Sequence, residues 1–232
     1  MYTFDEEWLR CRLRALDKPR RLAFAVACAE RTFGPYRYYA RQAHRGRPRF
    51  LRATLNNLWE LAVQRHIGHR EPFLDEGERL IPLSCMQADP EVEEACLYKE
   101  AHDLDIVADE AVYTLLAACQ CELDGDVQSS VVAAQHDYDL VTSSILYFDT
   151  RAKRRIYRAC ARRRGRAPRE IDLVNQIDYV QEELQQQMLD LQELTEWEGA
   201  GKYAELVSGL RRRAQRRARA LQVILRSLTS EV

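Results

Sequence analysis

The sequence has few residues that interrupt secondary structure. Only 9 Gly and 7 Pro occur among its 232 residues, so turns are few and the elements between them are long. No segment shows convincing alternation of apolar and polar residues over six positions, which is the pattern of a half-buried strand. These absences argue against a many-stranded sheet and favour long helices.

Long apolar runs are missing as well. No stretch of 18 apolar residues exists, so we expect no helix that spans a membrane. The N-terminal segment, MYTFDEEWLRCRLRAL, has no secretory apolar run. The seven cysteines are odd in number, form no Cys-x-x-Cys pair and mostly lie in apolar helical patterns, which is typical of buried free thiols. We therefore expect a cytoplasmic protein.

Motifs of known enzyme chemistry are also lacking. The sequence contains no Gly-x-Ser-x-Gly, no phosphate-binding Gly-rich loop, no His-Glu-x-x-His and no paired Glu-x-x-His. Cys160 lies among arginines, a setting that lowers a thiol pKa and makes it a weak candidate for a reactive thiol. We predict no catalytic residue and no cofactor.

Helix starts are well marked. Asp17 with Pro19, Asp89 with Pro90, and Asp126 are typical caps or first-turn residues, and Pro168 predicts the start of a long helix to about Glu196. Gly34-Pro35 and Gly46 predict helix ends, and the DGD at 124–126 predicts a turn. We predict an all-α bundle of about eight to ten helices forming one domain over residues 1–232. An Arg-rich insert lies near 150–169 and a basic C-terminal helix at 202–229.

Charge is segregated into blocks, although the whole chain has a net charge of −1. Residues 73–149 carry 2 basic and 18 acidic side chains, and residues 170–201 carry 9 acidic and no basic ones. The basic blocks are residues 1–72, 150–169 and 202–232, with net charges of +8, +10 and +6. Opposite blocks can pair internally and fix the order of the helices, or one block can face a partner of opposite charge. Both interpretations stay open from the sequence alone.

One acidic stretch, AHDLDIVADE, holds candidate ligands at helical spacing. His102, Asp105 and Asp109 lie at i, i+3 and i+7, on one side of a helix. Asp103 and Glu110 fall nearly opposite and are expected in solvent. Interhelix hydrogen bonds or a partner contact are the first interpretation of this stripe. A metal site would need a fourth ligand from another helix, with His66, His69, Glu60, His136 and Asp139 as sources. We predict no metal, and we take His102, Asp105, Asp109, Asp137 and Asp139 as candidate partner contacts.

A second polar group lies within apolar helices. Glu30, Arg31, Trp59 and Glu60 are set among apolar residues, and we predict that they form a structural network, with Arg31 paired to Glu60. The alternative is a carboxylate pair for acid–base chemistry.

The order of several motifs resembles the YjaG-like bacterial family of unknown function. These motifs are LRALDKPRRLAFAVACAERTFGPYRYYARQ, LNNLWE, GERLIP, DIVADEAVYTLL and LVNQIDYVQEELQQQMLDLQEL. The positions that carry the resemblance are Cys28, Glu30, Arg31, Pro35, Tyr36, Leu55, Trp59, Glu60, Ile81 and Pro82. The resemblance implies an all-α bacterial protein, with a homodimer as one arrangement, and it implies no known activity.

We therefore expect a non-enzymatic protein that acts by protein–protein interaction. An immunity protein that occludes a toxin through the acidic 73–149 surface is the specific form of this expectation. The first alternative is a metal-assisted enzyme that uses the His/Asp stripe. The second is nucleic-acid binding through the Arg-rich segments 150–169 and 211–219, which the acidic flanks make unlikely.

Overall fold

The described part of the structure, a computed structural model, is all-α. It comprises residues 2–44, 46–66, 104–149, 151–152, 154, 174–197 and 202–230. These residues form seven helices and no strand, which confirms the predicted fold class. The helices are α1 (Glu6–Arg14), α2 (Lys18–Gln42), α3 (Pro48–His66), α6 (Asp105–Asp124), α7 (Val127–Phe148), α10 (Asp178–Glu196) and α11 (Tyr203–Thr229).

Side-chain caps and a left-handed glycine set several helix ends. Asp5, Asp17 and Asp126 each accept a hydrogen bond from a backbone N–H in the first turn of the following helix, at 2.9, 3.0 and 3.2 Å. Gly125 ends α6 with φ at +66°, in the left-handed region that a residue without a Cβ adopts without strain. The turn predicted at 124–126 is therefore confirmed.

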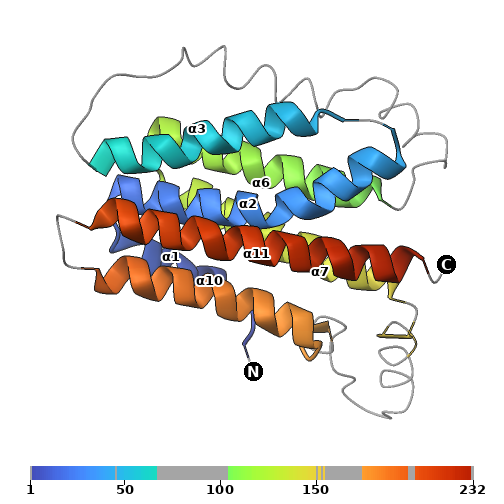
Figure 1. The fold of residues 1–232 in the computed structure, drawn as a ribbon. Helices are drawn as coiled ribbons and strands as arrows, with labels where there is room; N and C mark the ends of the chain where they lie inside the picture. Colours follow the sequence, from blue (N-terminus) through green and yellow to red (C-terminus); the bar gives the residue numbers. More distant parts are fainter. Residues whose placement is uncertain are drawn as a thin grey trace, which may run out of the picture.

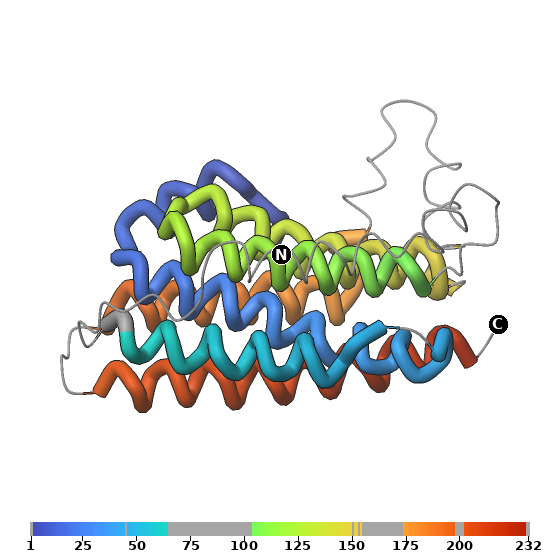
Figure 2. Tube along the Cα trace, turned by 90° about the horizontal axis from the view of Figure 1, so that it is seen from above, coloured from blue at the N-terminus to red at the C-terminus, as the bar shows by residue number. Residues whose placement is uncertain are grey.

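Helix α2 lies at the centre of the bundle. It packs against α3, α6, α7, α10 and α11, and the long helices run roughly along one direction around it (Figure 1). Seen from above, α3 and α11 lie side by side (Figure 2). Residues Leu22 to Ala29 are buried without interruption, as expected for a helix that is surrounded on all sides.

The predicted break at Gly34-Pro35 is wrong. Helix α2 continues through Pro35 to Gln42. A Cβ on Gly34 would lie 2.0 Å from the carbonyl oxygen of Ala218, so the glycine serves a close approach of α2 and α11. Proline inside a helix costs about 3 kcal/mol. The packing of α2 against five neighbours outweighs that local cost.

Two other predicted helix starts differ from the structure or lie outside its described part. The helix expected from Pro168 to Glu196 does end at Glu196, but α10 begins at Asp178 after a turn at 175–177. Helix α6 begins at Asp105, and the start predicted at Asp89 falls outside the described residues. Among the described helices, none is long and apolar enough to cross a bilayer.

A buried ion network joins α2, α7, α10 and α11. The Arg31 guanidinium contacts Asp137, Glu183 and Asp190 at 2.8, 2.6 and 2.7 Å, and all four side chains are fully buried. From α11, Arg217 contacts Glu183 at 3.0 Å and Arg213 contacts Asp190 at 3.3 Å. Three arginines thus face three buried carboxylates, and the balance of charge makes their burial tolerable.

The pKa values in this network follow from burial and from the crowding of carboxylates. Burial raises the pKa of Asp137, Arg31 opposes the rise, and the neighbouring Glu183 adds to it. Burial also raises the pKa of Asp190, against Arg31 and Arg213. For Arg31, burial disfavours the charged form, but the surrounding acidic groups raise its pKa well above the usual value. The guanidinium is therefore charged, and it joins α2 to the acidic side chains of α7 and α10.

Candidate cation-binding site on α6 and α7

The hairpin of α6 and α7 carries a polar cluster along one side. Five residues form it, and we call them the α6–α7 cluster: Asp105, Asp109, Glu110, His136 and Asp139. The first three come from the N-terminal end of α6, and the other two from the middle of α7, one helical turn apart. The hairpin connection at Gly125 makes the two helices antiparallel neighbours, which brings these positions together.

The geometry is tightest around His136. Its Nδ1 lies 2.6 Å from Glu110 Oε2, and the ligand atoms of Glu110, His136 and Asp139 all lie within 4.8 Å of one another. Tyr113 stacks on the His136 ring, with 5.1 Å between ring centroids, and Gln135 Nε2 donates to Asp139 Oδ1 at 2.8 Å. The side chains of His136 and Glu110 are 27% and 18% exposed, so the cluster is within reach of a ligand.

Burial and the mutual repulsion of the carboxylates disfavour the ionised forms of Asp109 and Asp139. Burial raises the pKa of Asp109, and the neighbouring Asp105 and Glu110 add to the rise. Burial likewise raises the pKa of Asp139; the hydrogen bond from Gln135 opposes the rise, Glu110 adds to it and His136 again opposes it. A cation placed among these groups would reverse this effect, because an opposite charge favours the ionised carboxylate.

Four of the acidic side chains on α10 are already paired with arginines. On α10, Glu193 contacts Arg213 at 2.6 Å and Glu182 contacts Arg217 at 2.5 Å, in addition to the buried network. Helices α6 and α7 contain no Lys or Arg. Within the described residues, no Lys or Arg from another helix forms an ion pair with Asp105, Asp109, Glu110 or Asp139. Within the described part, these four α10 carboxylates are thus paired with Arg31, Arg213 and Arg217, whereas the α6–α7 cluster has no Lys or Arg partner.

The residues predicted as partner contacts do not all lie on one surface of the structure. Asp105 is 6% exposed, and Asp109 and Asp139 are half-buried at the cluster. Asp137 lies in the buried network with Arg31, so it cannot reach a partner, which corrects its placement on a binding surface. His102 lies outside the described residues. The spacing argument also placed Glu110 in solvent, yet it is the residue that holds His136.

The second predicted network is also rearranged. Trp59 Nε1 donates to Glu30 Oε2 at 3.0 Å, and Arg52 binds both oxygens of Glu30 at 2.7 and 2.9 Å. Glu60 is exposed, so the predicted Arg31–Glu60 pair is wrong and Glu60 takes no part in a buried network. Arg31 instead forms ion pairs with carboxylates more than 100 positions later in the sequence.

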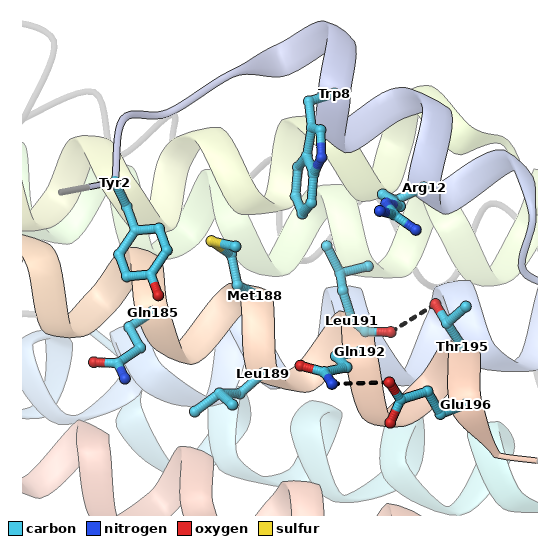
Figure 3. Close-up of a pocket in the computed structure, with 10 residues that line it drawn as sticks. All are labelled: Tyr2, Trp8, Arg12, Gln185, Met188, Leu189, Leu191, Gln192, Thr195 and Glu196. Carbon is cyan, nitrogen blue, oxygen red and sulfur yellow. Dashed lines mark hydrogen bonds between the residues drawn. The ribbon is translucent and has the colours of Figure 1, made fainter.

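A groove between the N-terminal segment and α10 is a separate surface feature. It has a volume of about 340 Å³ and is bordered by Tyr2, Trp8, Met188 and Leu189. Tyr2 and Trp8 point toward α10, and Met188 points from α10 toward them (Figure 3). Trp8 is 38% and Leu189 43% exposed. Gln192 Nε2 donates to Glu196 Oε1 at 2.8 Å, and the charged groups that border the groove, Arg12 and Glu196, have opposite signs.

Comparison with known proteins finds a matching sequence family and a solved structure of similar fold. A family described as "Protein of unknown function (DUF416)" matches residues 9–129. A crystal structure of a DUF416 family protein from Shewanella baltica OS155 is 20% identical, with a TM-score of 0.66 over 88% of this chain and 92% of that one. No curated protein matches. At this identity the structural likeness shows the fold alone.

Proposed function

We propose that this chain, which belongs to the DUF416 family of proteins of unknown function, acts by binding a basic partner protein through the α6–α7 cluster. One observation carries the proposal. Two half-buried carboxylates, Glu110 and Asp139, converge with His136, and no Lys or Arg from the described residues neutralises them, while four carboxylates of α10 are paired with arginines of the bundle. Complementary charge on a partner would supply the missing cation.

An arginine side chain fits the chemistry of the cluster. A guanidinium can donate two parallel hydrogen bonds to one carboxylate and further bonds to a second. Tyr113 is 43% exposed beside His136, and an aromatic ring in that position favours a cation over its face. Tyr147, 48% exposed on the same helix as His136, adds contact area farther along α7.

The narrower form of the proposal is an immunity protein whose partner is a toxin. The acidic 73–149 segment would cover a basic substrate-binding surface of the toxin and so occlude it. The support for this form is charge complementarity alone, so the partner must be identified by experiment.

The test compares two double variants with equal charge change. Glu110→Gln/Asp139→Asn removes two carboxylates from the cluster, and Glu7→Gln/Glu205→Gln removes two exposed ones from α1 and α11. Proteins retained by the immobilised wild type are identified by mass spectrometry, and the affinity of each purified partner is then measured. We expect the cluster variant to bind at least about tenfold more weakly, since one charge-assisted hydrogen bond contributes about 1.5–3 kcal/mol. Equal affinity of the wild type and both variants would contradict the proposal.

A divalent metal is the second candidate ligand of the same cluster. The observation that favours it is the set of Glu110, His136 and Asp139 atoms within 4.8 Å of one another, because a His with two carboxylates suits zinc and similar transition metals when other positions are open to water or substrate. Metal analysis of the purified protein and titration with Zn²⁺ distinguish the candidates. One equivalent of metal that is lost in Glu110→Gln/Asp139→Asn would favour the metal over the basic partner.

A further inference from the structure

A second site lies among arginines on the other helices of the bundle. A cavity of about 240 Å³ opens between α2, α3 and α11. Four arginines border it: Arg37 from α2, Arg52 from α3, and Arg211 and Arg219 from α11. The backbones of α2 and α11 approach closely at Gly34 and Ala218, which also border the cavity and leave room between the larger side chains.

Among the described residues, one carboxylate borders the cavity, and it is already neutralised. Glu30 is fully buried, and Arg52 binds both of its oxygens while Trp59 donates a third hydrogen bond. The Arg52 guanidinium also lies 4.0 Å above the centre of the Phe33 ring. The charges of Arg52 and Glu30 therefore cancel each other, and the charge of the other described side chains that border the cavity is positive.

The other three arginines have only neutral partners or none among the described residues. Arg37 Nη2 donates to Gln222 Oε1 at 2.9 Å, and Arg211 donates to Asn56 Oδ1. In the described part, Arg219 forms no ion pair and no hydrogen bond, and the buried Nε of Arg37 has no acceptor. Burial lowers the pKa of Arg37, and the nearby Arg41, Arg52 and Arg219 lower it further. The arginines thus repel one another where no anion lies between them.

We propose that this cavity binds a small phosphate-bearing anion, of the class of phosphate monoesters, through Arg37, Arg211 and Arg219. Guanidinium groups match phosphate oxygens with paired hydrogen bonds, and three of them around one cavity can reach different oxygens of a single phosphate. The volume is below the range of about 300–1,000 Å³ that is common for drug-sized ligands. The cavity therefore suits a phosphate with a small substituent.

The arrangement favours a small anion over a nucleic-acid backbone. A backbone needs a basic strip with several phosphate contacts, and two of the seven arginines along α11 are not available for such a strip. Arg213 and Arg217 instead bind carboxylates of α10. Arg37, Arg211 and Arg219 come from two different helices and border one cavity, so a single phosphate group matches them better than an extended strand.

The test uses inorganic pyrophosphate and orthophosphate as probes with the full-length protein. Isothermal titration calorimetry at low ionic strength should give one site per chain. Arg219→Gln is the test variant, and Arg216→Gln is its control, because both residues are exposed on α11 and only Arg219 borders the cavity. Both variants should fold, since surface substitutions change stability by about 0.5 kcal/mol or less.

The expected result is that Arg219→Gln binds pyrophosphate about tenfold or more weakly, the loss associated with one charge-assisted hydrogen bond. Arg216→Gln should bind like the wild type. Arg37→Gln should also weaken binding, and without phosphate it should leave the thermal midpoint unchanged or raise it, because a repelling charge is removed.

Three results would overturn the inference. The first is no binding of either probe, and the second is an equal loss of affinity in Arg219→Gln and Arg216→Gln. The third is a single-stranded oligonucleotide that competes with pyrophosphate and depends equally on Arg216 and Arg219, which would indicate an extended nucleic-acid surface. None of these results bears on the α6–α7 cluster, which is built from other helices.

Discussion

Replacing Arg31 by methionine should destabilise the bundle more than any surface substitution. The guanidinium contacts three carboxylates whose side chains are all fully buried. Removing one partner of a buried ion pair costs about 3–5 kcal/mol because an uncompensated charge stays in the core. Arg31 serves three carboxylates, so we expect the upper end of that range, about 5 kcal/mol. Domains are stable by only about 5–15 kcal/mol.

Urea unfolding followed by circular dichroism, with reductant to protect the cysteines, measures the effect. With a slope of about 2–3 kcal/mol per molar urea, the midpoint of Arg31→Met should fall by roughly 2 M. The matched control is Arg216→Met, which removes an exposed arginine from α11 and should change the free energy of unfolding by about 0.5 kcal/mol or less.

Arg31→Met can also fail to fold, and a rescue variant covers that outcome. Adding Asp137→Asn, Glu183→Gln and Asp190→Asn removes the uncompensated charges and should restore a cooperative transition, because these contacts are coupled. A loss below about 1 kcal/mol in Arg31→Met alone would refute the reasoning. A quadruple variant that is less stable than the single one would refute it too.

Three further predictions concern packing, pH and thiol access. Gly34→Ala should destabilise by about 1–3 kcal/mol, as overpacking does, since its Cβ would meet the Ala218 carbonyl. Gly209→Ala on α11, whose Cβ would lie 3.7 Å from the Arg213 side chain at an ordinary contact distance, should stabilise by roughly 0.5–1 kcal/mol, and thermal unfolding compares the two. The folded pKa of Asp137 is raised, so its stabilising contribution is present at acid pH and is lost as the pH rises through that pKa. The wild type should therefore lose stability as the pH rises, and Asp137→Asn should not lose this part. The free energy of unfolding of Asp137→Asn relative to the wild type should increase from acid to alkaline pH, and a constant difference across that range would contradict the assignment. Mass spectrometry after brief alkylation of the native protein should find exposed Cys11 modified well before the buried Cys28, Cys119 and Cys121, and equal rates would count against the packing of α2 and α6.

Local signals in the sequence were enough to predict the fold class and most helix ends. Caps at Asp17 and Asp126 and the turn at Gly125 depend on neighbours within a few positions. The continuation of α2 through Pro35 depends on α11, nearly 200 positions later, and no local rule contains that information. Tertiary packing therefore overrode the local signal of Gly34-Pro35.

The candidate site was only partly predictable for a similar reason. Helical spacing placed Asp105 and Asp109 on one side of α6, and the structure keeps them in the same cluster. Spacing within one helix could not show that Glu110 meets His136 across the hairpin. The partners of Arg31 could have been suspected from the sequence, because each is an acidic residue on the otherwise apolar face of its helix. Glu183 and Asp190 lie on the face that buries Val180, Leu184 and Leu191.

The central claim is that no Lys or Arg among the described residues neutralises the carboxylates of the α6–α7 cluster. Its most direct test is the free energy of unfolding of Asp109→Asn/Asp139→Asn at neutral pH, with Glu7→Gln/Glu205→Gln as the charge-matched control. Both aspartates have raised pKa values in the folded protein, so neutral side chains of the same shape should relieve an unfavourable charge. The account predicts a gain of about 0.5–1 kcal/mol, typical of improved surface charge, and little change in the control. A loss of more than about 1 kcal/mol in the cluster variant would show that a cation of this chain already neutralises the site, and would contradict the account.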